Sequence, residues 1–328
     1  VYPFESPNFL PSAKNKQVNL VRSVAYNLFR LHKYLSSIRY INRMIKETGA
    51  DVVVNFYELL TGLTYLFCHP KALMVCIAHQ YLFLHPDFVF PGQNRLSLVS
   101  LKFFTRMTAI GATKKLALSF RKMREVPSER IVVVPPLLRK EVLETTPVNG
   151  DYLHGYLLNS GFSEEIRSWH KVHPNVALHI FWDKKEVRPE VKVDSFLSFH
   201  QLNDTLFIRY MAGAKAYATT AGFESVCEAM YLGKPVLMVP THIEQSCNAF
   251  DAVQAGAGVV ADRFDLDALL ELSRTHRPNP AFSHWVKQAD WLILREFRPD
   301  LLMEETPASL WRRLSTRWIY RLGKTLSI

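Results

Sequence analysis

Short apolar runs alternate with segments of helical periodicity along most of this chain. The runs "ADVVVNF", "ALMVCIAHQ", "KLALSF" and "RIVVVPP" lie in the first half, and "DYLHGYLLN", "VALHIFWD", "KVDSFLSFH" and "KAYATT" lie in the second. Between them apolar residues recur at helical spacing, as at Leu28, Leu31, Leu35 and Ile38. Continuously apolar strands separated by helices are typical of a doubly wound parallel sheet, so the alternation predicts an α/β fold.

The alternation is interrupted by Pro135-Pro136 and by a polar run at residues 144–150, a pattern typical of a linker. A chain of 328 residues is also long for one hydrophobic core. We therefore expect two Rossmann-like domains that face each other across a cleft. The predicted boundaries are 1–143 for the N-terminal domain, 144–290 for the C-terminal domain and 291–328 for a helical tail. Because the chain opens at Val1 without a methionine, we expect the start of the N-terminal domain to be missing.

Composition narrows the classes of partner. The 40 basic and 30 acidic residues give a net charge of +10, which suits nucleic acid, an anionic membrane or a phosphorylated substrate. The basic residues are spread out and form no aromatic-basic RNA motif, so no nucleic-acid partner is expected. Four cysteines without C-x-x-C spacing are too few for a disulfide framework and favour a reducing, cytoplasmic setting.

Polar residues gather where the predicted strands end. Glu58 and His79 follow successive strands of the first half, and His200 follows a strand of the second half. Ligands of doubly wound sheets bind at the carboxyl ends of the strands. These positions are therefore candidates for a binding site.

The stretch "TTAGFESVCEAMYLGKPVLMVP" predicts a strand, a glycine turn, a helix and a second strand in succession. Two interpretations are open. Ser225 and Glu228 have the S-x-x-E spacing of a capping box, with Gly222 only making the turn. Alternatively, the strand, the glycine turn and the helix N-terminus form a site for a phosphate, since unpaired amides and the helix dipole attract an anion.

Further motifs follow this stretch in a fixed order. They are Gly222-Phe223-Glu224-Ser225, Glu228, Gly233-Lys234-Pro235, Pro240, Glu244-Gln245, Asn248-Ala249 and Ala255-Gly256-Ala257-Gly258. Over residues 152–261 the sequence resembles the donor half of nucleotide-sugar glycosyltransferases of the GT-B fold. The resemblance is to the branch that contains the UDP-glycosyltransferases and the peptidoglycan N-acetylglucosaminyltransferase.

This resemblance implies an enzyme that moves a sugar from a nucleotide-diphosphate donor, expected to be a UDP-sugar, to an acceptor hydroxyl. It implies donor phosphate contacts at Thr220, Gly222 and Ser225, ribose contacts at Glu228, sugar contacts at Glu244 and Gln245, and a place on the base side for His200. Many relatives have asparagine where this chain has Glu224. A carboxylate there repels a pyrophosphate unless it points away or complements the helix dipole.

Sugar transfer needs a base for the acceptor hydroxyl. Glu58 and His79 are the candidates in the first half, and the alternative for each is a hydrogen-bonded structural role at a strand end. No cofactor and no metal ion are expected. The D-x-D sequence at Asp265 directly precedes a helical run, so we interpret Asp265 as a helix cap.

The tail over residues 309–328 predicts an amphipathic helix with aromatic and leucine side chains on one side and basic residues beside them. This is the profile of a helix that lies on anionic lipid, and the alternative is a helix packed back across the domains. We therefore expect a cytoplasmic protein that lies peripherally on the inner face of the membrane. A lipid-linked or envelope glycan is its expected acceptor.

Two other functions use the same kind of fold. A sugar-nucleotide 2-epimerase would bind the same donor in the same place. A protein that binds a nucleotide sugar without catalysis would also retain these motifs, and Glu224 is compatible with that alternative.

Overall fold

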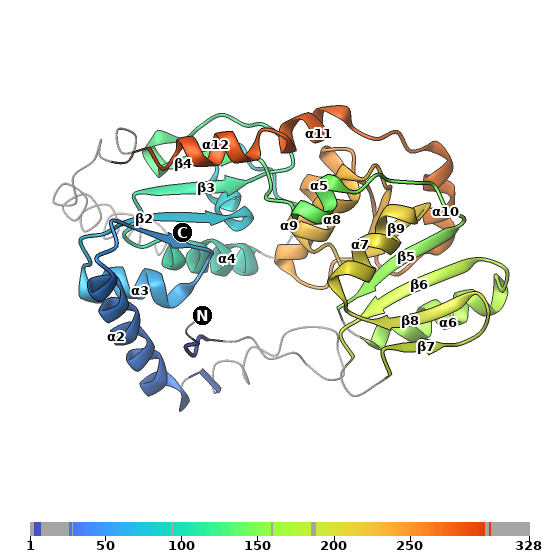
Figure 1. The fold of residues 1–328 in the computed structure, drawn as a ribbon, viewed down its shortest axis with the longest axis horizontal. Helices are drawn as coiled ribbons and strands as arrows, with labels where there is room; N and C mark the ends of the chain where they lie inside the picture. The colour runs from blue at the N-terminus through green and yellow to red at the C-terminus, as the bar shows by residue number, and fades with distance from the viewer. Residues whose placement is uncertain are drawn as a thin grey trace.

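The computed structural model describes residues 3–7, 26–27, 29–92, 95–158, 160–184, 188–298 and 302. They form two β-sheets with helices packed against them, one from each part of the chain (Figure 1). The predicted α/β class with two Rossmann-like sheets is therefore confirmed. Among the described helices, none has both the length and the apolar character that a membrane span requires. The predicted tail helix over residues 309–328 lies outside the described residues.

The first sheet has four parallel strands in the order β1-β2-β3-β4. They are β1 (Val52–Asn55), β2 (Leu73–Ala78), β3 (Lys114–Leu118) and β4 (Ile131–Val134). Its helices are α2 (Leu31–Thr48), α3 (Leu59–Cys68) and α4 (Arg95–Thr108), and a 3-10 segment η1 (His79–Leu84) follows β2. Every residue of β4 is buried, as expected of a strand that is apolar on both faces.

The second sheet has seven strands in the order β11-β10-β9-β5-β6-β8-β7. They are β5 (Tyr152–Leu157), β6 (Ala177–Trp182), β7 (Glu190–Lys192), β8 (Leu197–Gln201), β9 (Ala216–Thr219), β10 (Val236–Met238) and β11 (Gly258–Val260). From β5 the chain adds strands in one direction and then returns to add β9 on the other side. Such a reversal marks the place at which open α/β sheets bind ligands.

The second part of the chain contributes most of the helices (Figure 1). They are α5 (Lys140–Glu144), α6 (Ser163–Val172), α7 (Asp204–Gly213), α8 (Phe223–Tyr231), α9 (Ile243–Gln254), α10 (Leu266–Thr275), α11 (Pro280–Val286) and α12 (Ala289–Arg295), with a short 3-10 segment η3 (Ser160–Phe162). Another 3-10 segment, η2 (Pro127–Glu129), lies between β3 and β4 of the first sheet. The Asp265 carboxylate accepts a hydrogen bond from the Ala268 amide at 3.0 Å. The interpretation of Asp265 as the cap of α10 is confirmed.

One predicted strand is wrong. The run "KVDSFLSFH" is not a single strand, because β7 ends at Lys192 and pairs antiparallel with β8. Asp194 causes the break. Its Oδ1 accepts hydrogen bonds from the amides of Phe196 at 2.8 Å and Leu197 at 2.9 Å, which closes a turn between the two strands. The second sheet is therefore parallel except for β7 at its edge.

Helix α12 crosses back to the first sheet, as Figure 1 shows beside β4. Ala289 and Ile293 pack in one apolar cluster with Val75 and Ile77 of β2. The Lys114 ammonium also pairs with Glu296 at 2.8 Å. The boundary predicted at residue 290 consequently falls inside a helix that packs on the first sheet.

The predicted linker at residues 144–150 is held against the second part of the fold by a buried lysine. Lys234 is 1% exposed, and its Nζ donates to the Val148 carbonyl at 2.7 Å. Burial lowers the pKa of Lys234 to about 8. The lysine of the Gly233-Lys234-Pro235 motif therefore serves the fold by fixing the entry into β5.

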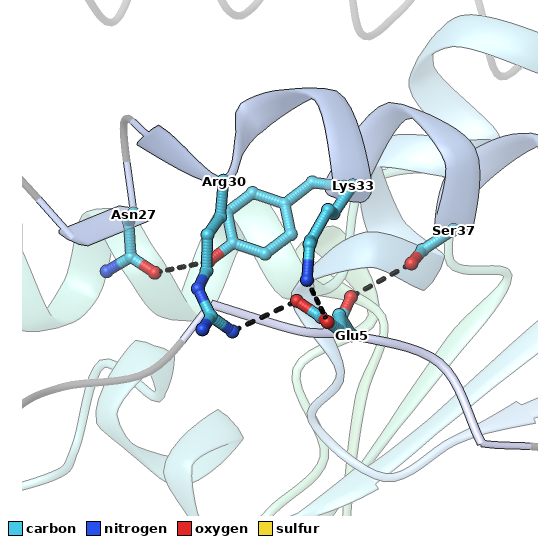
Figure 2. A network of polar contacts seen from close by, with 6 residues as sticks. Glu5, Asn27, Arg30, Lys33 and Ser37 are labelled. Atoms are coloured by element: carbon cyan, nitrogen blue, oxygen red, sulfur yellow. Dashed lines mark hydrogen bonds and ion pairs between the residues drawn. The ribbon is translucent and has the colours of Figure 1, made fainter.

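The short segment over residues 3–7 is fixed by polar contacts to α2 (Figure 2). The Glu5 carboxylate contacts Arg30 at 3.1 Å and Lys33 at 2.6 Å. The backbone carbonyl of Glu5 accepts a hydrogen bond from Ser37 Oγ at 3.0 Å. The next residue, Ser6, donates to Glu58 Oε1 at 2.8 Å. The segment therefore lies across the beginning of α3, next to one of the predicted bases.

Three histidines lie on neighbouring strands of the second sheet. His154 is fully buried, and its ring stacks on Tyr217 with 5.1 Å between the centroids. His179 Nδ1 lies 3.2 Å from His200 Nε2. Burial lowers the pKa of His154 to about 3 and that of His179 to about 4, and it also lowers the pKa of His200. The cluster is therefore neutral in the folded protein at neutral pH.

Acid is expected to destabilise the fold through this cluster. The unfolded chain binds protons at these sites below about pH 6.5, whereas folded His154 stays neutral until about pH 3. The free energy of unfolding therefore falls as the pH drops below 6.5. We expect His154→Phe, which keeps an aromatic ring in place, to reduce the fall of Tm between about pH 7.5 and about pH 5. A fall as large in the variant as in the parent protein would contradict this role.

Candidate functional site

The chain turns sharply between β9 and α8, beside the reversal of strand order. Ala221 is fully buried and has a left-handed backbone with a φ of 66°, which is uncommon for a residue with a side chain. Asn248 of α9 donates a hydrogen bond from Nδ2 to the Ala221 carbonyl at 3.4 Å. Thr220 is 2% exposed, while Gly222 is exposed at the start of α8. The Asn248-Ala249 motif therefore helps to hold this turn.

Helix α8 starts with Gly222 as its N-cap residue and has no side-chain cap in the described structure. Ser225 Oγ donates a hydrogen bond to the Gly222 carbonyl at 3.2 Å. This contact is not a helix cap, in which the hydroxyl would accept a hydrogen bond from an amide of the first turn. A Cβ at Gly222 would meet only Ser225 Oγ, at 3.6 Å. Exposed amides at the positive end of a helix favour an anion, and the geometry at Gly222 leaves room for one.

The capping-box interpretation of Ser225 and Glu228 is wrong. Glu228 is 3% exposed and binds Arg139, which directly precedes α5, instead of returning to the helix start. Arg139 Nε donates to Glu228 Oε1 at 2.6 Å, and Nη2 donates to Oε2 at 2.7 Å. This two-pronged ion pair leaves the first turn of α8 without the cap that the spacing predicted.

His79 brings the first sheet to this site. It follows β2, and its ring stacks on Phe223 of α8 with 4.5 Å between the centroids and 8° between the planes. His79 Nε2 lies 3.2 Å from Glu244 Oε1 of α9, and Gln80 Nε2 donates to the same oxygen at 3.1 Å. A predicted base and a predicted sugar-binding residue therefore lie in contact.

The contacts of Glu244 decide its charge. Burial raises the pKa of its carboxyl group, but electrostatic interactions with His79 and His242 and the hydrogen bond of Gln80 outweigh burial, so the net pKa is lowered. Glu244 is accordingly an anion at neutral pH.

Two other predicted residues make contacts that serve the fold. Glu58 Oε1 accepts from the Leu60 amide at 2.9 Å, so Glu58 caps α3, and it also accepts from Ser6. Gln245 Oε1 accepts from the amide of Thr241 at 2.9 Å and from its hydroxyl at 2.8 Å. Glu58 thus fits the structural alternative, and Gln245 closes the turn that leads into α9.

The predicted position of His200 is wrong. It lies inside β8, not beyond it, and is 5% exposed beneath Tyr210 of α7, whose ring centroid is 5.1 Å away. Its other neighbours are His179 and Phe181 of β6. The strand continues one residue past His200, to Gln201. His200 therefore has the backbone of a strand residue, and its imidazole lies under α7. A place on the base side stays a prediction.

The structure thus brings Gly222, Ser225 and Glu228 of the α8 region together with Glu244 and His79. Glu58 and His200 make their contacts elsewhere, with α3 and α7. Sequence reasoning missed the parts played by Arg139 and Phe223. Phe223 stands at the aromatic position of a recognised motif, which was a signal. Arg139 has no motif around it, and only the fold shows its partner.

Within the described ranges, no group of three or more histidine, cysteine, aspartate or glutamate side chains is arranged to hold a metal ion. All four cysteines are free thiols. The expectation that sugar transfer is independent of metal ions stays a prediction.

Solved structures of other proteins share the fold of this chain. The glycotransferase of kitacinnamycin has a TM-score of 0.56 and 15% identity, with 95% of this chain and 85% of that chain covered. CalG4, the calicheamicin glycosyltransferase, has a TM-score of 0.50 and 16% identity, with 89% and 83% covered. These likenesses show the fold, and they confirm that it is GT-B.

Sequence comparisons agree with the fold. A Caenorhabditis elegans protein that bears the name of a UDP-glucuronosyltransferase, ugt-48, is 30% identical over 111 residues, which are 32% of this chain and 19% of that protein. The matched stretch therefore spans about a fifth of the worm relative. The model of glycosyl transferase family 1 matches residues 9–272, which include both sheets and the turn at Gly222. On this match, the chain belongs to glycosyl transferase family 1.

Proposed function

We propose that this protein transfers a sugar from a nucleotide-diphosphate donor, a UDP-sugar, to the hydroxyl of an acceptor. The observation that carries the proposal is the contact of His79 with Phe223 and Glu244. It joins the end of a strand in the first sheet to the helices that follow β9 and β10 in the second. This contact supports a role for His79 as a base beside the proposed donor residues of the other half.

The donor diphosphate is proposed to bind at the start of α8. Exposed amides and the helix dipole would stabilise the negative charge of the departing nucleoside diphosphate, a task for which a metal is not required. The Ser225 hydroxyl can rotate from the Gly222 carbonyl to donate to a phosphate oxygen. Thr220 is buried, so its proposed contribution is through the backbone of the turn.

His79 is proposed as the base that takes the proton of the acceptor hydroxyl. The imidazolium that results would lie 3.2 Å from the anionic Glu244, which would stabilise it. Glu244 and Gln245 would also contact the donor sugar. His79 suits the role better than Glu58, since the carboxylate of Glu58 is occupied in capping α3.

The name of the worm relative supports uracil as the base of the donor nucleotide. A glycan or glycolipid acceptor, an anionic membrane surface and a cytoplasmic setting are proposed on the sequence alone. The acceptor and the membrane surface rest on residues 309–328 and on the net charge of +10, and the cytoplasmic setting rests on the spacing and small number of the cysteines.

Nucleotide binding tests the proposal directly. Titration calorimetry with UDP, GDP, TDP and CDP in EDTA should show selective binding of UDP. Glu228→Gln should weaken it by about tenfold to a hundredfold, because hydrogen bonds to a charged acceptor are lost. Failure of the folded protein to bind any of the four, or binding only with added metal, would count against the proposed site.

Gly222→Ala should separate binding from folding. The added methyl group meets nothing closer than 3.6 Å in the protein, so the stability cost should be no more than about 1 kcal/mol from the weaker N-cap. The same methyl group would lie where the diphosphate approaches the amides. We expect Tm to be nearly unchanged while UDP binding is lost; retention of UDP affinity would place the diphosphate elsewhere.

His79→Asn should slow transfer without abolishing donor binding. Loss of a general base lowers kcat by about a hundredfold to ten-thousandfold. The measurement is release of nucleoside diphosphate in the presence of a panel of hydroxyl acceptors. His69→Asn is the matched control, because His69 is exposed and has a left-handed backbone that asparagine readily adopts. Equal rates in both variants would refute His79 as the base.

A further inference from the structure

The ion pair between Arg139 and Glu228 joins the segment that connects the two sheets to the helix of the proposed donor site. Arg139 lies between β4 and β5 in the chain, and Glu228 lies in the second turn of α8. The Glu228 side chain is 5% exposed and that of Arg139 is 37% exposed. The pair is thus buried at the carboxylate and open to solvent at the guanidinium.

A buried carboxylate must be paired to remain ionised. Arg139 meets this need with two parallel hydrogen bonds of 2.6 and 2.7 Å, a geometry that fixes both the position and the plane of the carboxylate. Lysine could supply the charge but not the planar fork. The orientation of Glu228 therefore depends on the shape of the Arg139 side chain as well as on its charge.

The pair leaves Glu228 able to accept further bonds. A carboxylate offers about four lone-pair sites, and the two N–H groups of Arg139 use one on each oxygen. One site per oxygen remains. Two neighbouring hydroxyls, such as those of a ribose, present one donor for each of these sites.

Arg139 also balances the charge of this region. Its Nη1 lies 3.5 Å from Asp204 Oδ1, and the charge of Glu224 acts on the guanidinium as well. Three carboxylates around a proposed diphosphate site would repel the ligand. The guanidinium offsets that repulsion next to the start of α8.

From these contacts we infer that Arg139 is a positioning residue for ribose recognition. It holds the Glu228 carboxylate in the plane that lets its two oxygens accept hydrogen bonds from the two ribose hydroxyls of the donor. This inference rests on the proposed function, and it adds the residue that makes the site selective for a ribonucleotide.

The test compares UDP with 2′-deoxyuridine diphosphate by titration calorimetry. The unmodified protein should prefer UDP by about tenfold or more, the value of one hydrogen bond to a charged group. Arg139→Lys keeps a cation beside Glu228 but loses the fork, and it should reduce this preference to near unity while the protein stays folded. Arg139→Gln with Glu228→Gln removes both charges, so no unpaired charge is buried, and it should also show no preference.

Arg124→Lys is the matched control. Arg124 makes the same two-pronged pair, with Asp87 at 2.6 and 3.0 Å, but both side chains are exposed and remote in role from the donor site. It should retain the full preference for UDP. Agreement of Tm between Arg124→Lys and Arg139→Lys shows that any difference in preference is not a loss of folding.

The outcomes separate the inference from the function on which it rests. If Glu228→Gln loses the preference for UDP while Arg139→Lys keeps it, the ribose site stands and the role of Arg139 is refuted. If the unmodified protein binds UDP and the deoxy nucleotide equally, the inference is refuted while the proposed function stands. If it binds neither, both are refuted. Loss of the preference in Arg139→Lys and in Glu228→Gln, but not in Arg124→Lys, supports the inference.

Discussion

Stacking of His79 on Phe223 is the contact on which the arrangement of the site depends. It joins the end of β2 to the beginning of α8. Other buried contacts lie between the first sheet and the second part of the fold. Trp285 Nε1 donates to the Ser119 carbonyl at 3.0 Å, and Phe120 packs in the apolar cluster of the second sheet. Aromatic rings stacked in this way gain from apolar burial and from their preferred geometry. The site is therefore built between two halves whose relative position is fixed by packing.

The turn before α8 combines a strained residue with an open one. Ala221 occupies a left-handed conformation at a cost of about 1–2 kcal/mol, which the hydrogen bond from Asn248 and complete burial help to offset. Gly222, one residue later, has ordinary dihedral angles and open space at its Cα. Neither the backbone conformation nor the surrounding protein atoms therefore require a glycine at this position.

Most of the fold followed from local sequence patterns, whereas the site followed only in part. Continuous apolar runs located nine of the eleven strands, because burial on both faces is a local property. Strands β7 and β11 were missed, since each has only three residues and neither contains a fully buried residue. The motif around Gly222 correctly located the start of α8. The partner of Glu228 was not predictable, since Arg139 is 89 residues away and nothing local distinguishes it. A capping box was the best local explanation, and a tertiary ion pair replaced it.

Three acids in helices α8 and α9 are paired with basic side chains that precede β5 in the chain. Glu228 binds Arg139 of the connecting segment, Glu244 lies against His79 of the first half, and Asp251 of α9 pairs with Arg121, which follows β3, at 3.0 Å. Burial raises the pKa of Asp251 although Arg121 opposes the shift, so this carboxyl group depends strongly on its partner. Without the first half, Glu244 and Asp251 would lose these partners, which is costly for a buried carboxylate. The orientation of these acids therefore depends on contacts that form only when both sheets and the segment between them are assembled.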